Sequence, residues 1–228
     1  MIDTKNFKAD DILFTEPKKI SVNGNEYQKI FFRNSLIFAT DKILSSGVRF
    51  NKEQNMKVSS YSIPLRLNEE LTQFMTSIID KCTSHLRENY SEEIDRVNKY
   101  RMERVKFLEK QIERELTVDI PDEEHIKNCS ALIDGAATSA QINICKCFDP
   151  YMNCLFAKIN SYSRLFDVEN RPINAKDIID KKCYVKAAIE IESICIGDTS
   201  INLKVNVKEA YIKDYHSESD YRNELMFN

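Results

Sequence analysis

The chain has 228 residues, with 33 Lys and Arg against 36 Asp and Glu, 42% hydrophobic residues and only four glycines. That length fits one large domain, and 10% aromatic residues with few Gly and Pro exclude low-complexity and fully disordered classes. No apolar run approaches the roughly 18–20 residues of a membrane span, so we expect no membrane association. The net charge of −3 excludes a polycation that binds nucleic acid through bulk charge alone.

The first residues, Met1 to Asn6, are polar and lack the apolar core of a signal peptide. We therefore expect an intracellular, reducing compartment, in which the seven cysteines would be thiols. Four of them cluster in residues 129–154: Cys129, Cys145, Cys147 and Cys154. Structural zinc sites usually show paired C-x2-C knuckles, which this set lacks. Free thiols are the favoured interpretation, no metal is predicted, and a zinc site stays open as an alternative.

The first third of the chain predicts β-strands. Residues 20–22 and 25–32 flank Asn23-Gly24, a pair that tolerates the positive φ angles of a tight hairpin turn. A second apolar stretch follows at 36–39, and residues 61–67 are apolar at every second position. Pro64 has no amide donor, which indicates an edge or a bulge in that strand.

At Asn68 the hydrophobic period changes from that of a strand to that of a helix. Asn68 is a natural N-cap for an amphipathic helix over 69–89, and helical character continues from Ser91 to about Leu116. The second segment carries many charges of both signs over a thin apolar seam. It is interpreted as a solvated projecting helix or helical hairpin, or else as a coiled-coil partner surface. Residues 122–147 are poorly defined by sequence.

The last third predicts a strand over 151–159, a polar connector over 167–182 and an antiparallel hairpin. In that hairpin, residues 185–191 and 201–207 alternate apolar and polar on either side of a turn at Gly197-Asp198-Thr199-Ser200. The phase of the pattern shifts near Ala210, which indicates a bulge. About five to seven strands in two groups with one helical excursion favour a small barrel or a curled sheet.

Catalytic motifs are missing from the sequence. It contains no phosphate-binding glycine loop, no nucleophile elbow and no H-E-x-x-H, and no candidate nucleophile accompanies its three histidines. We therefore expect a binding protein, with neither enzymatic activity nor a cofactor.

The strand segments combine aromatic and basic residues, the two components of a single-stranded nucleic-acid surface. On a strand, Lys182, Tyr184 and Lys186 point to one face. The predicted nucleic-acid-binding residues are Phe32, Arg33, Arg49, Tyr61, Arg66, Lys158, Tyr162, Arg164, Arg171, Lys182, Tyr184 and Lys186. By contrast, Phe31, Phe38 and Phe156 are predicted to belong to the core.

The charge is unevenly distributed along the chain. Residues 214–228 hold four acidic side chains and one arginine, which accounts for the whole net charge of −3. The remaining body is neutral, so it can carry a basic face.

The layout resembles that of the OB-fold single-stranded DNA-binding proteins of large DNA viruses and short-tailed phages. The resemblance rests on Tyr61-Ser62-Ile63-Pro64-Leu65 leading into the 69–89 helix, and on the 182–197 and 201–205 strands that close the chain. It implies a role in DNA replication, recombination or repair, no cofactor, and self-association. It also implies that the tail, through Asp220, Glu224 and Phe227, recruits replication proteins.

The resulting prediction is a β-rich α+β protein. A single OB-like antiparallel β-barrel would span 1–228, with a helical insertion over 68–147 and a mildly acidic tail over 214–228. It would bind single-stranded DNA, with RNA as another possible ligand, and form homo-oligomers in the host cytoplasm or nucleus if viral. The alternative is a viral structural or scaffold protein that assembles through the charged helical insertion.

Overall fold

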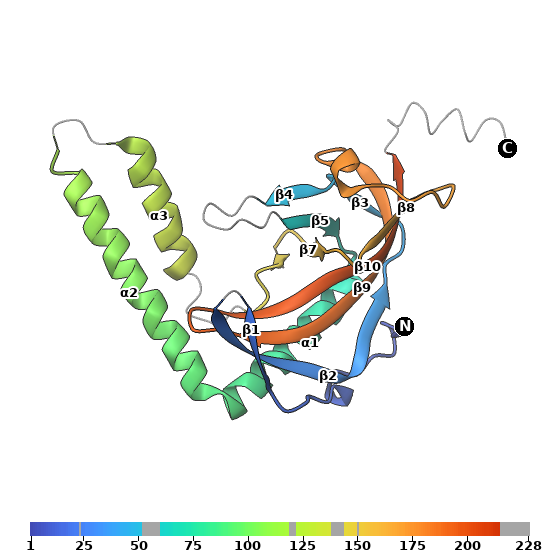
Figure 1. The fold of residues 1–228 in the computed structure, drawn as a ribbon, viewed down its shortest axis with the longest axis horizontal. Helices are drawn as coiled ribbons and strands as arrows, with labels where there is room; N and C mark the ends of the chain where they lie inside the picture. Colours follow the sequence, from blue (N-terminus) through green and yellow to red (C-terminus); the bar gives the residue numbers. More distant parts are fainter. Residues whose placement is uncertain (23, 52–59, 119–121, 138–143, 150, 215–228) are drawn as a thin grey trace.

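The computed structural model describes residues 1–22, 24–51, 60–118, 122–137, 144–149 and 151–214. Within these ranges the chain is a mixed, sheet-rich α+β protein with three α-helices and one sheet of ten strands (Figure 1). The strands are β1 (Lys18–Val22), β2 (Asn25–Ala39), β3 (Ile43–Ser45), β4 (Arg49–Asn51), β5 (Ser60–Arg66), β6 (Phe148–Asp149), β7 (Cys154–Ile159), β8 (Arg164–Asp167), β9 (Cys183–Ile196) and β10 (Ile201–Asp214). The helices are α1 (Glu69–Asn89), α2 (Ser91–Glu115) and α3 (Glu123–Ala137).

The sheet follows the order β1-β2-β9-β10-β7-β5-β4, with β3 on β9, β6 on β7 and β8 on β10. Most pairs are antiparallel, but β10 pairs in parallel with both β7 and β8. The expectation of an antiparallel sheet is therefore wrong at these pairs. The reason lies in the order of the strands. The chain reverses direction between β8 and β9 and reverses again between β9 and β10, because β9 and β10 are antiparallel. Two reversals bring β10 back to the direction of β7 and β8. The described sheet is an open path, and it has more strands than expected because several contain only two to four residues.

Both predicted hairpins are present. Val22 pairs with Asn25 across the two-residue connection, in which Gly24 has a φ of +81°. The long β9–β10 ladder shifts register between Val207 and Glu209, next to the predicted change of phase. Apolar residues 36–39, predicted as a separate stretch, continue β2 beyond a register shift between Phe31 and Leu36.

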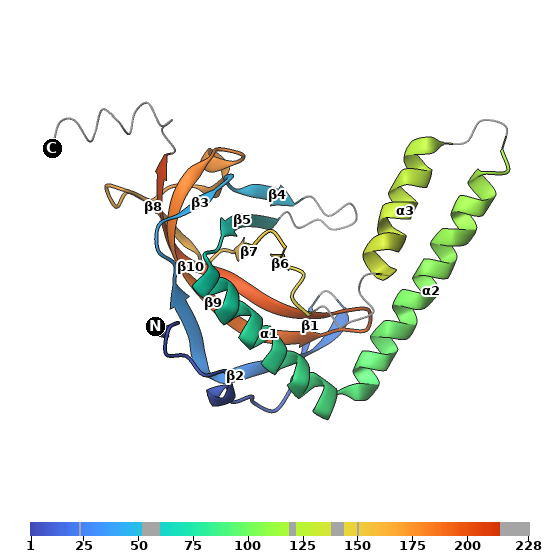
Figure 2. The ribbon, with the colours of Figure 1, turned by 180° about the vertical axis from the view of Figure 1, so that it is seen from behind.

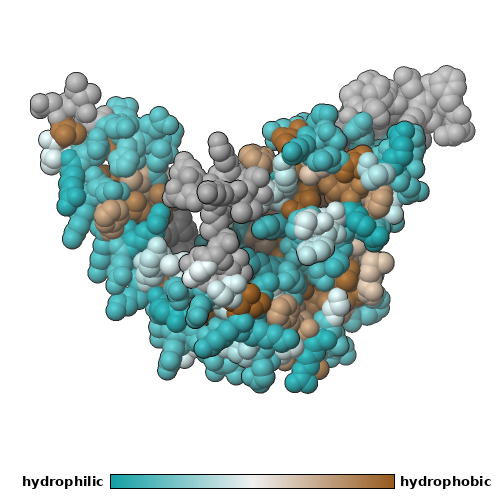
Figure 3. Space-filling view, viewed as in Figure 1, coloured by the Kyte–Doolittle hydropathy of each residue, from teal (hydrophilic) through white to brown (hydrophobic). Residues whose placement is uncertain are grey.

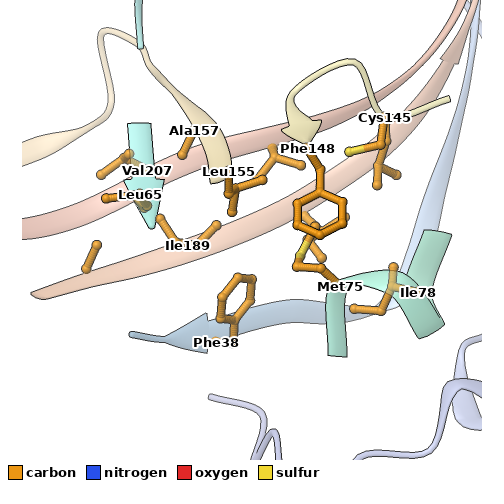
Figure 4. Close-up of a cluster of buried hydrophobic side chains, with 14 of the residues drawn as sticks. Phe38, Leu65, Met75, Ile78, Cys145, Phe148, Leu155, Ala157, Ile189 and Val207 are labelled. Atoms are coloured by element: carbon orange, nitrogen blue, oxygen red, sulfur yellow. The ribbon is translucent and has the colours of Figure 1, made fainter. Parts of the chain in front are cut away.

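Helix α1 completes the hydrophobic core on one side of the sheet (Figures 1 and 2). The Asn68 side chain accepts a hydrogen bond of 2.9 Å from the Leu71 amide, which confirms the predicted N-cap. The buried face of the helix consists of Leu71, Phe74, Met75, Ile78, Cys82 and Leu86. Figure 4 shows Met75 and Ile78 in one buried cluster with Phe38, which is fully buried as predicted. Helix α1 is therefore part of the core, although the sequence placed it in an insertion.

Helices α2 and α3 form a projection that we call the helical arm (Figures 1 and 2). Ile94 and Val97 at its base belong to the hydrophobic core, and Leu108 is buried further along the arm. Helix α3 lies in the segment that the sequence left undefined. The sequence nevertheless contains an N-cap for this helix, because the Asp122 side chain accepts a hydrogen bond of 3.0 Å from the His125 amide. No helix in the described part of the chain has the length and apolarity needed to cross a membrane.

Candidate nucleic-acid interface

The sheet has one side covered by α1 and an opposite side that we call the outer face. Residues in register on neighbouring strands point to the same face, so the pairing defines rows of side chains across the sheet. One such row crosses five strands and consists of Arg49, Ser62, Lys158, Asn206 and Glu190. Arg49 and Lys158 are exposed in this row, which places two cations about two strand spacings, roughly 10 Å, apart.

An aromatic ring lies beside these two cations. Phe156 is two residues from Lys158 on β7 and therefore shares its face, whereas Leu155 and Ala157 point into the core. The Arg49 guanidinium carbon is 5.2 Å from the centre of the Phe156 ring. Phe156 is half-buried and does not belong to the core cluster. A base can thus reach a flat ring at the point where two cations can neutralise its phosphates.

A second aromatic and basic group lies where β9, β10 and β8 meet. Lys186 is opposite Tyr211, which is opposite Phe166, and the last two rings stack with centres 5.5 Å apart. A hydrogen bond to the Glu209 carboxylate raises the pKa of Tyr211, so this phenol stays neutral and donates. On the same face, the Lys42 ammonium lies 4.2 Å from the centre of the Tyr184 ring.

A third group lies on the β1–β2 side of the outer face. Lys18 and Lys29 are opposite each other, and each ammonium is 5.8 Å from the centre of the Phe31 ring. Lys29 also pairs with Glu192 at 3.0 Å. Burial raises the pKa of Glu192, but hydrogen bonds from Lys29 and Asn206 outweigh it and bring this pKa below its ordinary value. This carboxylate therefore stays charged and neutralises one of the two lysines.

The ion pairs divide the cations of the outer face into two kinds. Three cations are neutralised by neighbouring glutamates: Lys29 by Glu192, Lys208 by Glu190 at 3.3 Å and Arg164 by Glu209 at 2.7 Å. Others form no ion pair with any residue that the structure describes, and these are Arg49, Lys158, Lys186 and Lys204. Within the described part of the chain, the outer face therefore carries cations without an ion-pair partner beside half-buried rings.

Several predicted binding residues do lie on or beside the outer face. Arg49, Lys158, Arg164, Tyr184 and Lys186 occupy it as described above. Arg66 joins them, because it pairs with Cys154, which shares the face of Phe156. Two further predicted residues are exposed next to strand ends: Tyr162, which is 84% exposed, precedes β8, and Lys182 precedes β9.

Other predicted residues are placed differently. Phe32 and Tyr61 are partly buried and pack against the core, which disfavours but does not test the prediction that they stack on bases. Arg33 is exposed within the register shift of β2, and Arg171 is held by Asp167 at 2.7 Å and Glu169 at 2.9 Å. The tail residues lie outside the described ranges, and they are Asp220, Glu224 and Phe227.

The sequence interpretation missed two rings on the outer face, Phe31 and Phe156. Both were predicted to be core residues, and that prediction is wrong. A signal for Phe156 was present, because strand alternation from the exposed Lys158 puts Phe156 on the wet side. For Phe31 the local signal was ambiguous, because Ile30, Phe31 and Phe32 are consecutive apolar residues with no visible alternation.

The four clustered cysteines do not converge on one point. Cys129 lies 3.6 Å from the Nε2 atom of His125 on α3, and the Cys145 and Cys147 sulfurs are 3.2 Å apart. Cys154 is on the outer face of β7. Within the described ranges, no three His, Cys, Asp or Glu side chains are grouped as metal ligands. No disulfide joins any of the seven cysteines, all of which lie in the described ranges.

Comparison with known proteins gives two matches. Residues 151–224 match the model of a family described as a protein of unknown function, DUF2738. No curated protein matches the chain. Among solved structures, the chain is similar to a single-stranded DNA-binding protein from bacteriophage Enc34 in complex with single-stranded DNA. The two are 9% identical, the match covers 89% of this chain and 97% of the other, and the TM-score is 0.42, too low to establish a shared fold.

Proposed function

We propose that the protein binds single-stranded DNA along the outer face of its sheet. The observation that carries this proposal is a set of cations that form no ion pair with a described residue and lie next to accessible rings, above all Arg49 and Lys158 around Phe156. Lys186 and Lys204 add positive charge further along the face. The cations would contact phosphates, and the rings would stack on bases at about 1–3 kcal/mol each.

The same geometry favours a single strand over a duplex. In a duplex the bases stack on one another, so their faces cannot reach the ring of Phe156 or Phe31. Each of these rings already has a cationic neighbour. When a base stacks on the ring, this cation can contact the phosphate of the same nucleotide. Stacking is tolerant of sequence because every base has an aromatic face. We therefore propose binding without strong sequence preference.

The remaining expectations are part of the same proposal. An OB-like barrel is supported by β3, which pairs with β9 and also contacts β5, so that distant parts of the open sheet approach each other. We propose a role in DNA replication, recombination or repair without enzymatic activity of its own, and recruitment of replication proteins through the tail. We also propose a reducing intracellular compartment, in which cysteines remain thiols.

The test is a binding measurement with a fluorescently labelled oligothymidine, followed by anisotropy. We expect binding at low salt that weakens steeply as salt is added, because phosphate contacts release counterions. Unlabelled single-stranded DNA should compete, and duplex DNA of the same length should compete poorly. Absence of binding at low salt, or equal competition by the duplex, would overturn the proposal. Competition by RNA of the same sequence decides whether the site distinguishes DNA from RNA.

A second candidate function is a structural protein that assembles through the helical arm. It is favoured by large apolar side chains exposed there, including Met102 at 59% and Leu132 at 50%. Figure 3 shows apolar side chains on the arm amid hydrophilic ones. This candidate predicts stable oligomers with no affinity for the labelled oligonucleotide, so the same binding measurement separates the two functions.

A further inference from the structure

Helix α2 has an exposed side that carries two aromatic residues and is adjacent to its buried side. Tyr100 is 40% exposed and Phe107 is 58% exposed, and their spacing of seven residues places them on one side of the helix. Most residues that face the core and the rest of the arm lie roughly 100° around the helix: Ile94, Val97, Arg101, Leu108 and Ile112. Gln111 is the exception, because it lies on the aromatic side and accepts a hydrogen bond of 4.0 Å from the Cys129 thiol of α3. Two aromatic side chains thus stand in solvent on a regular helix.

The charged residues on this side are ordered so that two antiparallel copies of the helix would bring opposite charges together. Glu93, Glu103, Arg104 and Arg114 lie within about 60° of the two aromatic residues. Arg96 lies on this side too, but it already pairs with Asp198 at 3.9 Å. If a second α2 is laid antiparallel about a two-fold axis between positions 103 and 104, Tyr100 meets Phe107 of the other helix. The same operation brings Glu93 against Arg114 and Glu103 against Arg104.

Every pair that these six residues make in this arrangement is favourable. Each charged contact joins opposite signs, and the aromatic pair occurs twice because of the symmetry. A parallel arrangement would instead place each charged residue against its own copy, which is repulsive. None of the four charged residues forms an ion pair with any described residue of its own chain. They are therefore free to pair between chains.

We propose that this side of α2, defined by Glu93, Tyr100, Glu103, Arg104, Phe107 and Arg114, binds a second copy of the same chain in an antiparallel, two-fold symmetric pair. The contact face spans about 30 Å along the helix. It lies on the helical arm and uses no residue of the outer face, so the inference does not depend on DNA binding.

The test measures self-association of the full chain by sedimentation velocity over a concentration series, without nucleic acid. Arg104→Glu places two like-charged contacts at the two-fold axis and should weaken dimerisation by at least about tenfold. The double variant Glu103→Arg/Arg104→Glu exchanges the two charges and should restore association to near the wild-type level. Lys106→Glu is the matched control, because it makes the same change of charge on an exposed residue outside the face. Far-UV circular dichroism checks that each variant is folded.

The outcomes decide the proposal. Loss in Arg104→Glu with recovery in the double variant supports the antiparallel pair. A wild-type protein that stays monomeric at the highest concentration overturns it. So does a dimer that Arg104→Glu and Lys106→Glu affect equally, because that dimer forms through another surface. The DNA-binding proposal stands or fails separately, since no oligonucleotide is present.

Discussion

Removal of the outer-face cations that pair with no described residue should change how DNA binding depends on salt. The perturbation is the triple variant Arg49→Ala/Lys158→Ala/Lys186→Ala. All three side chains are exposed and none forms an ion pair with a described residue, so their loss should leave the fold intact. The matched control is Arg87→Ala, which removes an exposed arginine from α1, on the opposite side of the sheet.

The size of the effect follows from counterion release. For single strands, each phosphate contact contributes about 0.7 to the slope of log affinity against log salt concentration. Loss of three contacts should therefore reduce the magnitude of the slope by about 2. If the salt-independent part of the affinity is unchanged, this corresponds to roughly hundredfold weaker binding at 0.1 M salt.

The assay is fluorescence anisotropy of a labelled oligothymidine at several salt concentrations, for the wild type, the triple variant and the control. We expect the control to keep the wild-type slope within error. The reasoning is refuted if the triple variant also keeps that slope, or if its slope falls no more than that of Arg87→Ala. In either case the strand would lie elsewhere on the molecule.

Three further predictions separate binding from stability. Phe156→Ala should weaken oligonucleotide binding by about 1–3 kcal/mol with an unchanged salt slope. Phe32→Ala should lower the urea midpoint of unfolding and leave the affinity intact, because Phe32 packs against the core. The reverse result would mean that Phe32, and not Phe156, contacts the bases. Burial lowers the pKa of His85 below its ordinary 6.5. As the pH falls through that range, the unfolded chain takes up a proton before the folded chain does, so the free energy of unfolding should decrease. His85→Phe should lose less between pH 7 and 5, and equal losses would contradict the burial argument. Gly47→Ala, at a φ of +96° and facing backbone, should lower thermal stability far more than Gly24→Ala at +81° in open space; equal effects would contradict the clash.

Local signals in the sequence were enough to predict many elements of the fold. Asn23-Gly24, the Asn68 cap and the alternation around the turn at Gly197 each depend on residues that are close together in the chain. Turn chemistry, capping and periodicity are properties of a few consecutive residues, so no distant partner is needed to recognise them. Helix α3 was missed although Asp122 caps it, because the residues that follow show little amphipathic pattern.

The outer face was decided by the tertiary structure. The run Ile30-Phe31-Phe32 contains no local alternation, whereas for Phe156 the alternation from Lys158 was present but not used. A shift of one residue in register exchanges the two faces of a strand. For Phe31, only the pairing of β2 with β9 places the ring outside, and the pairing of β7 with β5 agrees with the outward position of Phe156.

The distribution of charge was also determined in part by the sequence and in part by the tertiary structure. The sequence alone shows that residues 214–228 account for the net charge of −3 and that the rest of the chain is neutral. Which basic residues remain uncompensated depended on partners distant in sequence: Glu209 neutralises Arg164, whereas Lys158 lies opposite Ser62 and Asn206. Because an ion pair requires two groups within a few ångströms, only the folded chain distinguishes a cation available for phosphate from one that is already paired.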